Sequence, residues 1–315
     1  MQMTRRNLMA GTAGLGLSMA FRPLSAQANV EIGTGYFRTR VGEFDVISLS
    51  DGSVRRPLDD AFVRNAPLEE VQAALAAADL PTDHIINSFT PFVVIADGRH
   101  VLFDTGFADN GPEGTGRLHD SMAEAGIDPA AIDAIVMSHL HPDHINGLRR
   151  SDASLVYPEA DLWIPQPELD HWMSEERMAA APEGAQGAFR AVRRVLDGYP
   201  EARLTGFEPG AEVAGLIATA PGFGHTPGHT ILSVGEGADS FTYIGDAAHL
   251  PALFVAHPDW QLMFDMDPEM ARTTRREVLG RLAAEGGLVG GYHFPAPAIG
   301  RIEAAAAGYA FEPSA

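Results

Sequence analysis

The chain has 315 residues, 45% of them apolar in type, which is enough to build one large α/β core. Its formal net charge is −20 and all of its 22 basic residues are arginine, which argues against nucleic acid or an anionic membrane surface as a partner. There is no cysteine, so disulfides, thiolate metal ligands and a thiol nucleophile are excluded.

The first 28 residues have the composition of an export signal. The twin arginine Arg5-Arg6 precedes a Gly- and Ala-rich apolar stretch over 8–21, and Ala26-Gln27-Ala28 is a small-x-small cleavage site. We expect a signal of the twin-arginine (Tat) type over 1–28, one domain over 29–315, and a periplasmic or secreted location. The alternative, an N-terminal membrane anchor, is disfavoured because the stretch is short and glycine-rich, so no stable membrane insertion is expected.

Hydrophobic patterning predicts strand-rich blocks that alternate with single helices. In chain order, the expected elements are strand 44–49, helix 68–78, strands 92–96 and 100–103, helix 116–126, strands 132–137, 155–157 and 161–164, helix 189–196, strands 215–219, 230–234 and 240–244, helix 271–284 and strand 287–291. This order indicates two sheets face to face with helices outside, a four-layer α/β sandwich. In such a fold, active residues lie on loops at one end of the strands.

The most specific motif, His139-Leu140-His141-Pro142-Asp143-His144, follows the strand expected over 132–137. Imidazole nitrogens and carboxylate oxygens are ligands that Zn²⁺ accepts. His139 and His141 can converge on one metal from an irregular loop, while Asp143 and His144 point to a second position. The alternative interpretation is a polar surface loop that is rich in histidine.

Four residues cannot complete the ligand shells of two metals, so further ligands must come from elsewhere in the chain. Three later segments supply them. His229 ends the Gly- and Pro-shaped loop 224–230, Asp246 follows the strand over 240–244, and His293 follows the last expected strand.

These segments, together with Asp104-Thr105-Gly106, resemble the motifs of the metallo-β-lactamase-fold superfamily in order and spacing. The resemblance implies two divalent metal ions, with Zn²⁺ the expected metal. It places His139, His141 and His229 on one ion, Asp143, His144 and His293 on the other, and Asp246 between them. It also implies that Asp104 orients the site by hydrogen bonds, and by analogy with other metal sites His225 is expected in the same supporting role.

Within the superfamily, the sequence is most similar to the methyl parathion hydrolase-like group, which also contains lactone and aryl-ester hydrolases. The likeness rests on 224–230, 245–250 and 293–300, and it makes Trp163 a pocket aromatic. Two departures from the pattern of that group argue against specificity for organophosphates. Gly111 stands where that group has a pocket aromatic, and His249 stands where it has an apolar residue.

The resemblance implies a hydrolase in which two metals activate a bridging water as hydroxide, with Asp143 or Asp246 moving a proton. The expected substrate is a small-molecule lactone, aryl ester or related ester. Alternatives on the same site are hydrolysis of organophosphate triesters or of β-lactams. Iron-dependent redox chemistry is disfavoured because His144 with Asp143 fits zinc-type dinuclear hydrolases better. A catalytically inactive binding module is disfavoured by the complete ligand set. Related hydrolases are often dimers, so a homodimer is compatible with the resemblance.

Overall fold

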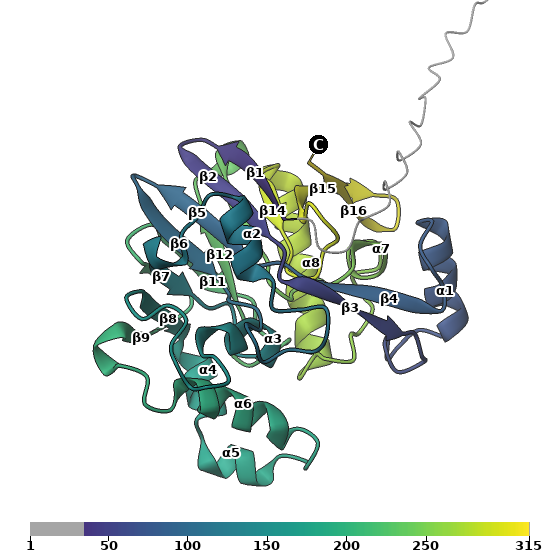
Figure 1. The fold of residues 1–315 in the computed structure, drawn as a ribbon. Coiled ribbons are helices and arrows are strands. Elements are labelled where there is room, and N and C mark those ends of the chain that lie inside the picture. The colour runs from purple at the N-terminus through teal and green to yellow at the C-terminus, as the bar shows by residue number, and fades with distance from the viewer. Residues whose placement is uncertain (1–34, 315) are drawn as a thin grey trace, which may run out of the picture.

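The computed structural model describes residues 35–314, so the expected signal over 1–28 and the first residues of the expected domain lie outside the described residues. Within this range, two seven-stranded sheets lie face to face and helices cover their outer faces (Figure 1). The predicted four-layer α/β sandwich is therefore confirmed. None of the helices in the described range is long and apolar enough to cross a membrane.

The first sheet has the strand order β1-β2-β5-β6-β7-β8-β9. Its strands are β1 Tyr36–Val41, β2 Phe44–Leu49, β5 Phe92–Ala96, β6 Arg99–Phe103, β7 Ile132–Val136, β8 Asp161–Pro165 and β9 Leu204–Phe207. The strands from β6 to β9 are parallel, so their carboxyl ends share one edge.

The second sheet has the order β10-β11-β12-β13-β14-β15-β16. Its strands are β10 Glu212–Val213, β11 Ile217–Pro221, β12 Thr230–Val234, β13 Phe241–Tyr243, β14 Leu288–Gly290, β15 Ile299–Ala305 and β16 Gly308–Pro313. Only β13 and β14 pair in parallel within this sheet, and both deliver their following loops to the same edge.

The remaining elements lie outside the two large sheets (Figure 1). A separate two-stranded sheet pairs β3 Gly52–Pro57 with β4 His84–Phe89. The α-helices are α1 Leu68–Ala77, α2 Leu118–Glu124, α3 Pro142–Ile145, α4 Gln166–Trp172, α5 Glu175–Ala180, α6 Gln186–Leu196, α7 Pro251–Phe254 and α8 Pro268–Glu285. Short 3₁₀ helices are η1 Pro129–Ala131, η2 Asn146–Leu148, η3 Glu201–Arg203 and η4 Gly237–Asp239.

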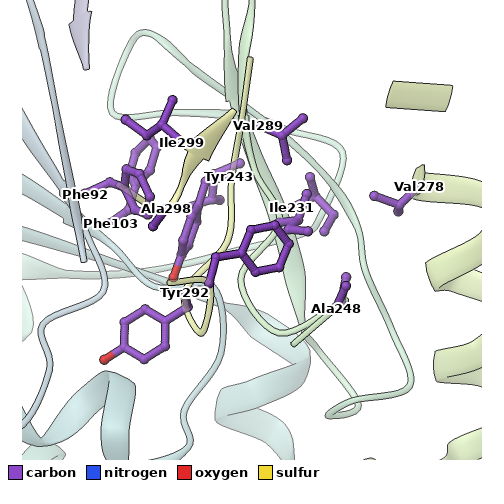
Figure 2. Packing of buried hydrophobic residues seen from close by; sticks show 14 of the residues in the cluster. Phe92, Phe103, Ile231, Tyr243, Ala248, Val278, Val289, Tyr292, Ala298 and Ile299 are labelled. Carbon is purple, nitrogen blue, oxygen red and sulfur yellow. The ribbon is translucent and has the colours of Figure 1, made fainter. Parts of the chain in front are cut away.

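The buried side chains form one core between the sheets and a second beneath the helices that cover the first sheet. In the core between the sheets, the Tyr243 ring packs against Phe92 and Phe103 with centroid separations of 5.2 and 5.7 Å (Figure 2). The second core takes the apolar face of α6, including Val192 and Val195. These two cores hold the sheets and helices rigidly beneath the loops at the strand ends.

Most of the predicted elements are confirmed, including strands β2 and β12 with the expected bounds. The strand expected over 155–157 is wrong. In the structure this segment is a loop that makes only an isolated bridge between Leu155 and Arg149. Tyr157 is nevertheless buried in the second core, which explains why the sequence is apolar there.

Candidate metal centre

The histidines and carboxylates singled out from the sequence meet where strands of both sheets end. His139 and His141 follow β7, and the short helix α3 carries Asp143 and His144. From the second sheet, Asp246 follows β13 and His293 follows β14, while the loop 222–229 precedes β12. The site therefore lies at the seam between the sheets, built from loops on a rigid scaffold.

One group of potential ligands consists of His139, His141, His225 and Asp246, whose donor atoms all lie within 4.8 Å of one another. The Nε2 atom of His225 is 2.9 Å from Nδ1 of His141 and 3.2 Å from Oδ2 of Asp246. These separations are short enough for one ion to contact all four side chains.

A second group consists of Asp143, His144 and His293. The Oδ2 atom of Asp143 lies 3.7 Å from Nε2 of His144 and 3.4 Å from Nε2 of His293. Asp246 also reaches this group, because its Oδ1 is 3.3 Å from Nε2 of His144 and its Oδ2 is 3.1 Å from Nε2 of His293. Asp246 thus lies between the two groups, where a bridging carboxylate was expected.

The structure places His225 and His229 differently from the expectation, because His225 and not His229 belongs to the first group of potential ligands. Both ring nitrogens of His229 have partners within the protein: Nδ1 lies 3.0 Å from the Gly222 carbonyl, and Nε2 accepts the backbone N–H of Asp246 at 3.0 Å. His229 is also pressed beneath Gly245, where a Cβ would lie only 2.7 Å from Nε2. Because β12 begins at the next residue, His229 is held below the site, while His225 lies at the site itself.

Asp104 has the supporting position that was expected of it. Its buried carboxylate accepts hydrogen bonds from Nδ1 of His144 at 2.7 Å, the Ser138 hydroxyl at 2.6 Å and the Tyr243 hydroxyl at 2.6 Å. Its backbone adopts the left-handed region, with φ of 56°, which the short polar side chain of Asp tolerates. The bond to His144 directs the other ring nitrogen, Nε2, toward the second group.

Sequence reasoning missed two buried carboxylates beside the site. Glu168 in α4 accepts the backbone N–H groups of Leu140 at 2.9 Å and Gly228 at 2.7 Å, which joins the two histidine loops. Asp265 accepts a hydrogen bond from Nδ1 of His225 at 3.0 Å. Neither residue belongs to a local motif, and each lies far along the chain from the histidine loops that it supports, so no sequence signal could have revealed them.

The buried groups of the site strongly shift one another's pKa values. Burial raises the pKa of Asp246, but the surrounding histidines, His293 and His144 above all, hold it well below its usual range. Burial lowers the pKa of His225, yet the carboxylates of Asp246 and Asp265 outweigh this and raise it to about 9. Burial and neighbouring histidines hold the pKa of His139 well below its usual value, so that ring is neutral and able to coordinate.

The donor set fits two divalent metal ions. Among the described residues, Nε2 of His139, Nε2 of His144 and Oδ1 of Asp246 are buried and lack a hydrogen-bond partner. Buried polar atoms without partners are costly unless something satisfies them. Here all three belong to groups whose donor atoms converge, and their nitrogen and oxygen chemistry suits Zn²⁺.

The expected pocket residues differ in position. His249 lies in the site, with its ring stacked on His293 at 4.1 Å and its Nε2 3.0 Å from Oδ2 of Asp246. Trp163 is half-buried and packs against the core between the sheets. The tryptophan ring beside His141 is that of Trp172, at a centroid separation of 5.8 Å.

Gly111 leaves no room for a side chain, because a Cβ there would lie 2.6 Å from Cγ of Phe107. The aromatic of this loop is Phe107 itself, whose ring packs edge-on against Phe89 at 5.0 Å. Phe89 in turn packs against His293 at 5.5 Å. An aromatic contact therefore reaches the site from this loop, although from a different position than the sequence comparison indicated.

The fold and donor set define a protein class of αββα sandwiches that hold two metal ions at the seam between their sheets. The sequence matches the metallo-beta-lactamase superfamily over residues 89–289, which is more than half of the chain. The chain therefore belongs to that superfamily. The matched range includes every residue of the two ligand groups except His293. None of the curated proteins matches the sequence at a significant level.

Solved structures extend the likeness over nearly the whole described chain. AidC, a dizinc quorum-quenching lactonase in complex with a product, N-hexanoyl-L-homoserine, aligns with a TM-score of 0.83 and 26% identity over 89% of this chain and 98% of that one. Hydrolase AbOPH of the beta-lactamase superfamily aligns with a TM-score of 0.83 and 24% identity over 90% and 98%. A quorum-quenching N-acyl homoserine lactone lactonase aligns with a TM-score of 0.57 and 16% identity over 82% and 94%. The similarities to AbOPH and to the N-acyl homoserine lactone lactonase show a shared fold and nothing more.

Proposed function

We propose that this protein is an exported dinuclear metal-dependent hydrolase that cleaves lactones, aryl esters or related esters. The observation that carries the proposal is the convergence of seven ligand side chains on two adjoining positions, with Asp246 shared between them. The similarity to a dizinc lactonase over 98% of that enzyme's chain supports the substrate class. The export part of the proposal rests on the sequence of residues 1–28.

In this proposal His139, His141 and His225 hold one ion, Asp143, His144 and His293 hold the other, and Asp246 contacts both. When bound, two such ions supply an activated water as nucleophile and polarise the electrophilic oxygen of the substrate. The protein's own contribution is to fix the ligand geometry before substrate arrives. The hydrogen bonds that Asp104 accepts from His144 and Asp265 accepts from His225 serve that purpose.

Asp143 is the better candidate to carry a proton to the leaving oxygen. Its side chain is 23% exposed, whereas that of Asp246 is 2% exposed. Asp246 is also surrounded by the ring nitrogens of four histidines, which hold its carboxylate ionised. A partly exposed carboxylate can exchange its proton with solvent between turnovers, so we assign the proton-carrying role to the Asp143 carboxylate.

Apolar side chains at the rim of the site suit an acyl or aryl substituent on the substrate. The ring of Phe264 is 37% exposed and lies 6.1 Å from the His249 ring. Met266 is 45% exposed, and its backbone N–H donates to the His225 carbonyl at 3.1 Å. Large exposed apolar residues next to buried polar groups are typical of a ligand site.

The proposal is tested by measuring metal content and a substrate panel on the same preparation. Elemental analysis should give two ions per chain. The panel compares kcat/KM for dihydrocoumarin, phenyl acetate, methyl parathion and the cephalosporin nitrocefin. We expect the lactone or the aryl ester to be cleaved fastest and the β-lactam slowest. The two metals could activate water against any of these substrates, so the pocket walls must select among them. A phosphotriester is disfavoured because Gly111 and His249 depart from the organophosphate pattern.

The control is His139→Ala, purified in parallel, which should lose activity toward every substrate if this site does the chemistry. A higher kcat/KM for methyl parathion than for both carbonyl substrates would overturn the substrate class. A preparation that binds two ions but hydrolyses none of the four would overturn the assignment of these ester classes.

A further inference from the structure

Three buried side chains form a continuous chain of contacts that ends at the metal centre. Nδ1 of His225 lies 3.0 Å from Oδ1 of Asp265, and Oδ2 of Asp265 accepts a hydrogen bond from Nη2 of Arg275 at 3.1 Å. The side chains of His225, Asp265 and Arg275 are 1%, 0% and 1% exposed. These contacts are therefore shielded from bulk solvent.

The contact between His225 and Asp265 determines which ring nitrogen faces the site. An ionised carboxylate accepts only, so the His225 proton lies on Nδ1 and points at Asp265. Nε2 then faces His141 and Asp246, whose nearest atoms lie 2.9 and 3.2 Å away, and its lone pair is available to a metal once the ion displaces any proton on that nitrogen. A carboxylate behind a histidine ligand both orients the ring and makes it a stronger donor to a metal.

Arg275 connects this carboxylate to the loops that surround the centre. From within α8, its Nε donates to the Ala247 carbonyl at 2.7 Å and its Nη1 to the Trp260 carbonyl at 2.5 Å. Ala247 is the residue directly after Asp246, and Trp260 lies in the same loop between α7 and α8 that carries Asp265. One guanidinium thus fixes the distance between the turn that carries Asp246 and the carboxylate that supports His225.

We propose that Asp265 and Arg275 are positioning residues for the ion held by His139, His141 and His225, and that they act through the His225 ring. This inference rests on the proposed metal centre. The ion held by Asp143, His144 and His293 has a separate support, because His144 is held by Asp104 instead. Changes to Asp265 should therefore weaken that first ion selectively. Changes to Arg275, which also contacts the turn after Asp246, should weaken the first ion more than the second.

The test measures Zn²⁺ release from the fully loaded protein by competition with a chelating dye at constant pH. Asp265→Asn should weaken one of the two ions about 10- to 100-fold and change the other by less than about threefold. Arg275→Lys keeps a charge but cannot span all three acceptors, so it should weaken the same ion by a smaller factor. Arg276→Lys on the same helix is the matched control, since Arg276 pairs with the exposed Asp259 and should leave both ions unchanged.

A double variant separates positioning from a general loss of structure. If Asp265 acts through His225, adding Asp265→Asn to His225→Ala should weaken Zn²⁺ binding no further than His225→Ala alone. Additive effects in this cycle would overturn the proposal. Unchanged Zn²⁺ release from folded Asp265→Asn would also overturn it. If Asp265→Asn does not fold, unchanged Zn²⁺ release from folded Arg275→Lys would overturn it in the same way. An unaltered protein that binds no Zn²⁺ would instead overturn the proposed metal centre, and the positioning role with it.

Discussion

The Nε2 atom of His229 accepts a hydrogen bond from the backbone N–H of Asp246 at 3.0 Å. This bond holds the turn that presents the shared carboxylate to both ligand groups. His229 therefore supports the metal centre from beneath, whereas His225, four residues earlier in the same loop, faces it. The two histidines of this short loop therefore have different positions relative to the metal centre, and substitutions at each should have different effects on metal content.

We predict that His225→Ala loses one of the two ions, because a donor atom of the first group disappears. Its kcat/KM should fall by at least about 100-fold. His229→Gln should retain two ions per chain and lose activity by only about tenfold, since it loosens the Asp246 turn without removing a ligand. Elemental analysis of both purified variants makes the comparison. Loss of an ion from His229→Gln, with two ions kept by His225→Ala, would restore the assignment made from sequence.

Asp246→Ala should weaken both ions together, since its carboxylate approaches His225 of the first group and His144 and His293 of the second. We expect fewer than two ions per chain after dialysis and no measurable turnover. Asp120→Ala, which removes an exposed aspartate from α2, is the control for the loss of a carboxylate. Two tightly bound ions and normal turnover in Asp246→Ala would show that this carboxylate does not bridge.

Glu168→Gln should destabilise the protein by about 1–3 kcal/mol, because an amide NH₂ replaces one of the acceptor oxygens that face buried N–H groups. The two histidine loops at Leu140 and Gly228 lose part of their connection. The free energy of unfolding in urea measures the effect, and exposed Glu176→Gln is the control. Equal unfolding free energies for Glu168→Gln and the unaltered protein would mean that this connection adds no stability.

The stability of the protein should depend on pH through Asp51. Burial raises the pKa of this carboxyl from 3.8 to about 7, despite hydrogen bonds from the backbone N–H groups of Leu118 and Phe107. The folded state thus binds a proton more tightly than the unfolded state, so this stabilising contribution is present below about pH 4 and is lost as the pH rises through 7.

The free energy of unfolding should therefore fall between pH 5 and pH 8 more steeply for the unaltered protein than for Asp51→Asn, which has no proton to lose. Urea titrations of both proteins at each pH give the difference, and the comparison removes contributions from other groups that titrate in both. Parallel pH profiles would show that Asp51 keeps an ordinary pKa.

Export should depend on the arginine pair in residues 1–28. Replacing Arg5 and Arg6 by lysine keeps the positive charge but removes the feature that the Tat route reads. We expect the Lys-Lys precursor to remain in the cytoplasm, as followed by cell fractionation and immunoblotting. Normal export of that variant would indicate a different route.

Local sequence patterns predicted those helices and strands whose ends are marked by residues close by in the sequence. β2 and β12 are short apolar runs, and Asp51-Gly52 follows the first while Gly228 precedes the second, so their bounds were readable. The hairpin of β15 and β16 was missed, because much of both strands is Gly, Ala, Glu or Pro, which have low β propensity, and the strands depend on pairing across the sheet. The strand expected at 155–157 was wrong because apolar residues there pack as a loop.

Only those residues of the candidate site that lie in short sequence motifs could be predicted. The ligands at 139–144, Asp246 and His293 lie in short distinctive segments at strand ends, and the structure brings them together. Spacing could not distinguish His225 from His229, since the deciding factors are the start of β12 and the close approach of Gly245. Asp265 and Glu168 act across long sequence separations, and such pairings are fixed only by the tertiary fold.

The centre draws its donors from both sheets, with His139 and His144 following the first and His225, Asp246 and His293 belonging to the second. A bound ion is therefore also a cross-link between the two halves of the sandwich. Ions present at a thousandfold excess over their dissociation constant would add about 4 kcal/mol to the stability of the folded state. Stripping them should accelerate amide hydrogen exchange on both sides of the seam at once, so that occupancy of the centre governs how tightly the halves are held together.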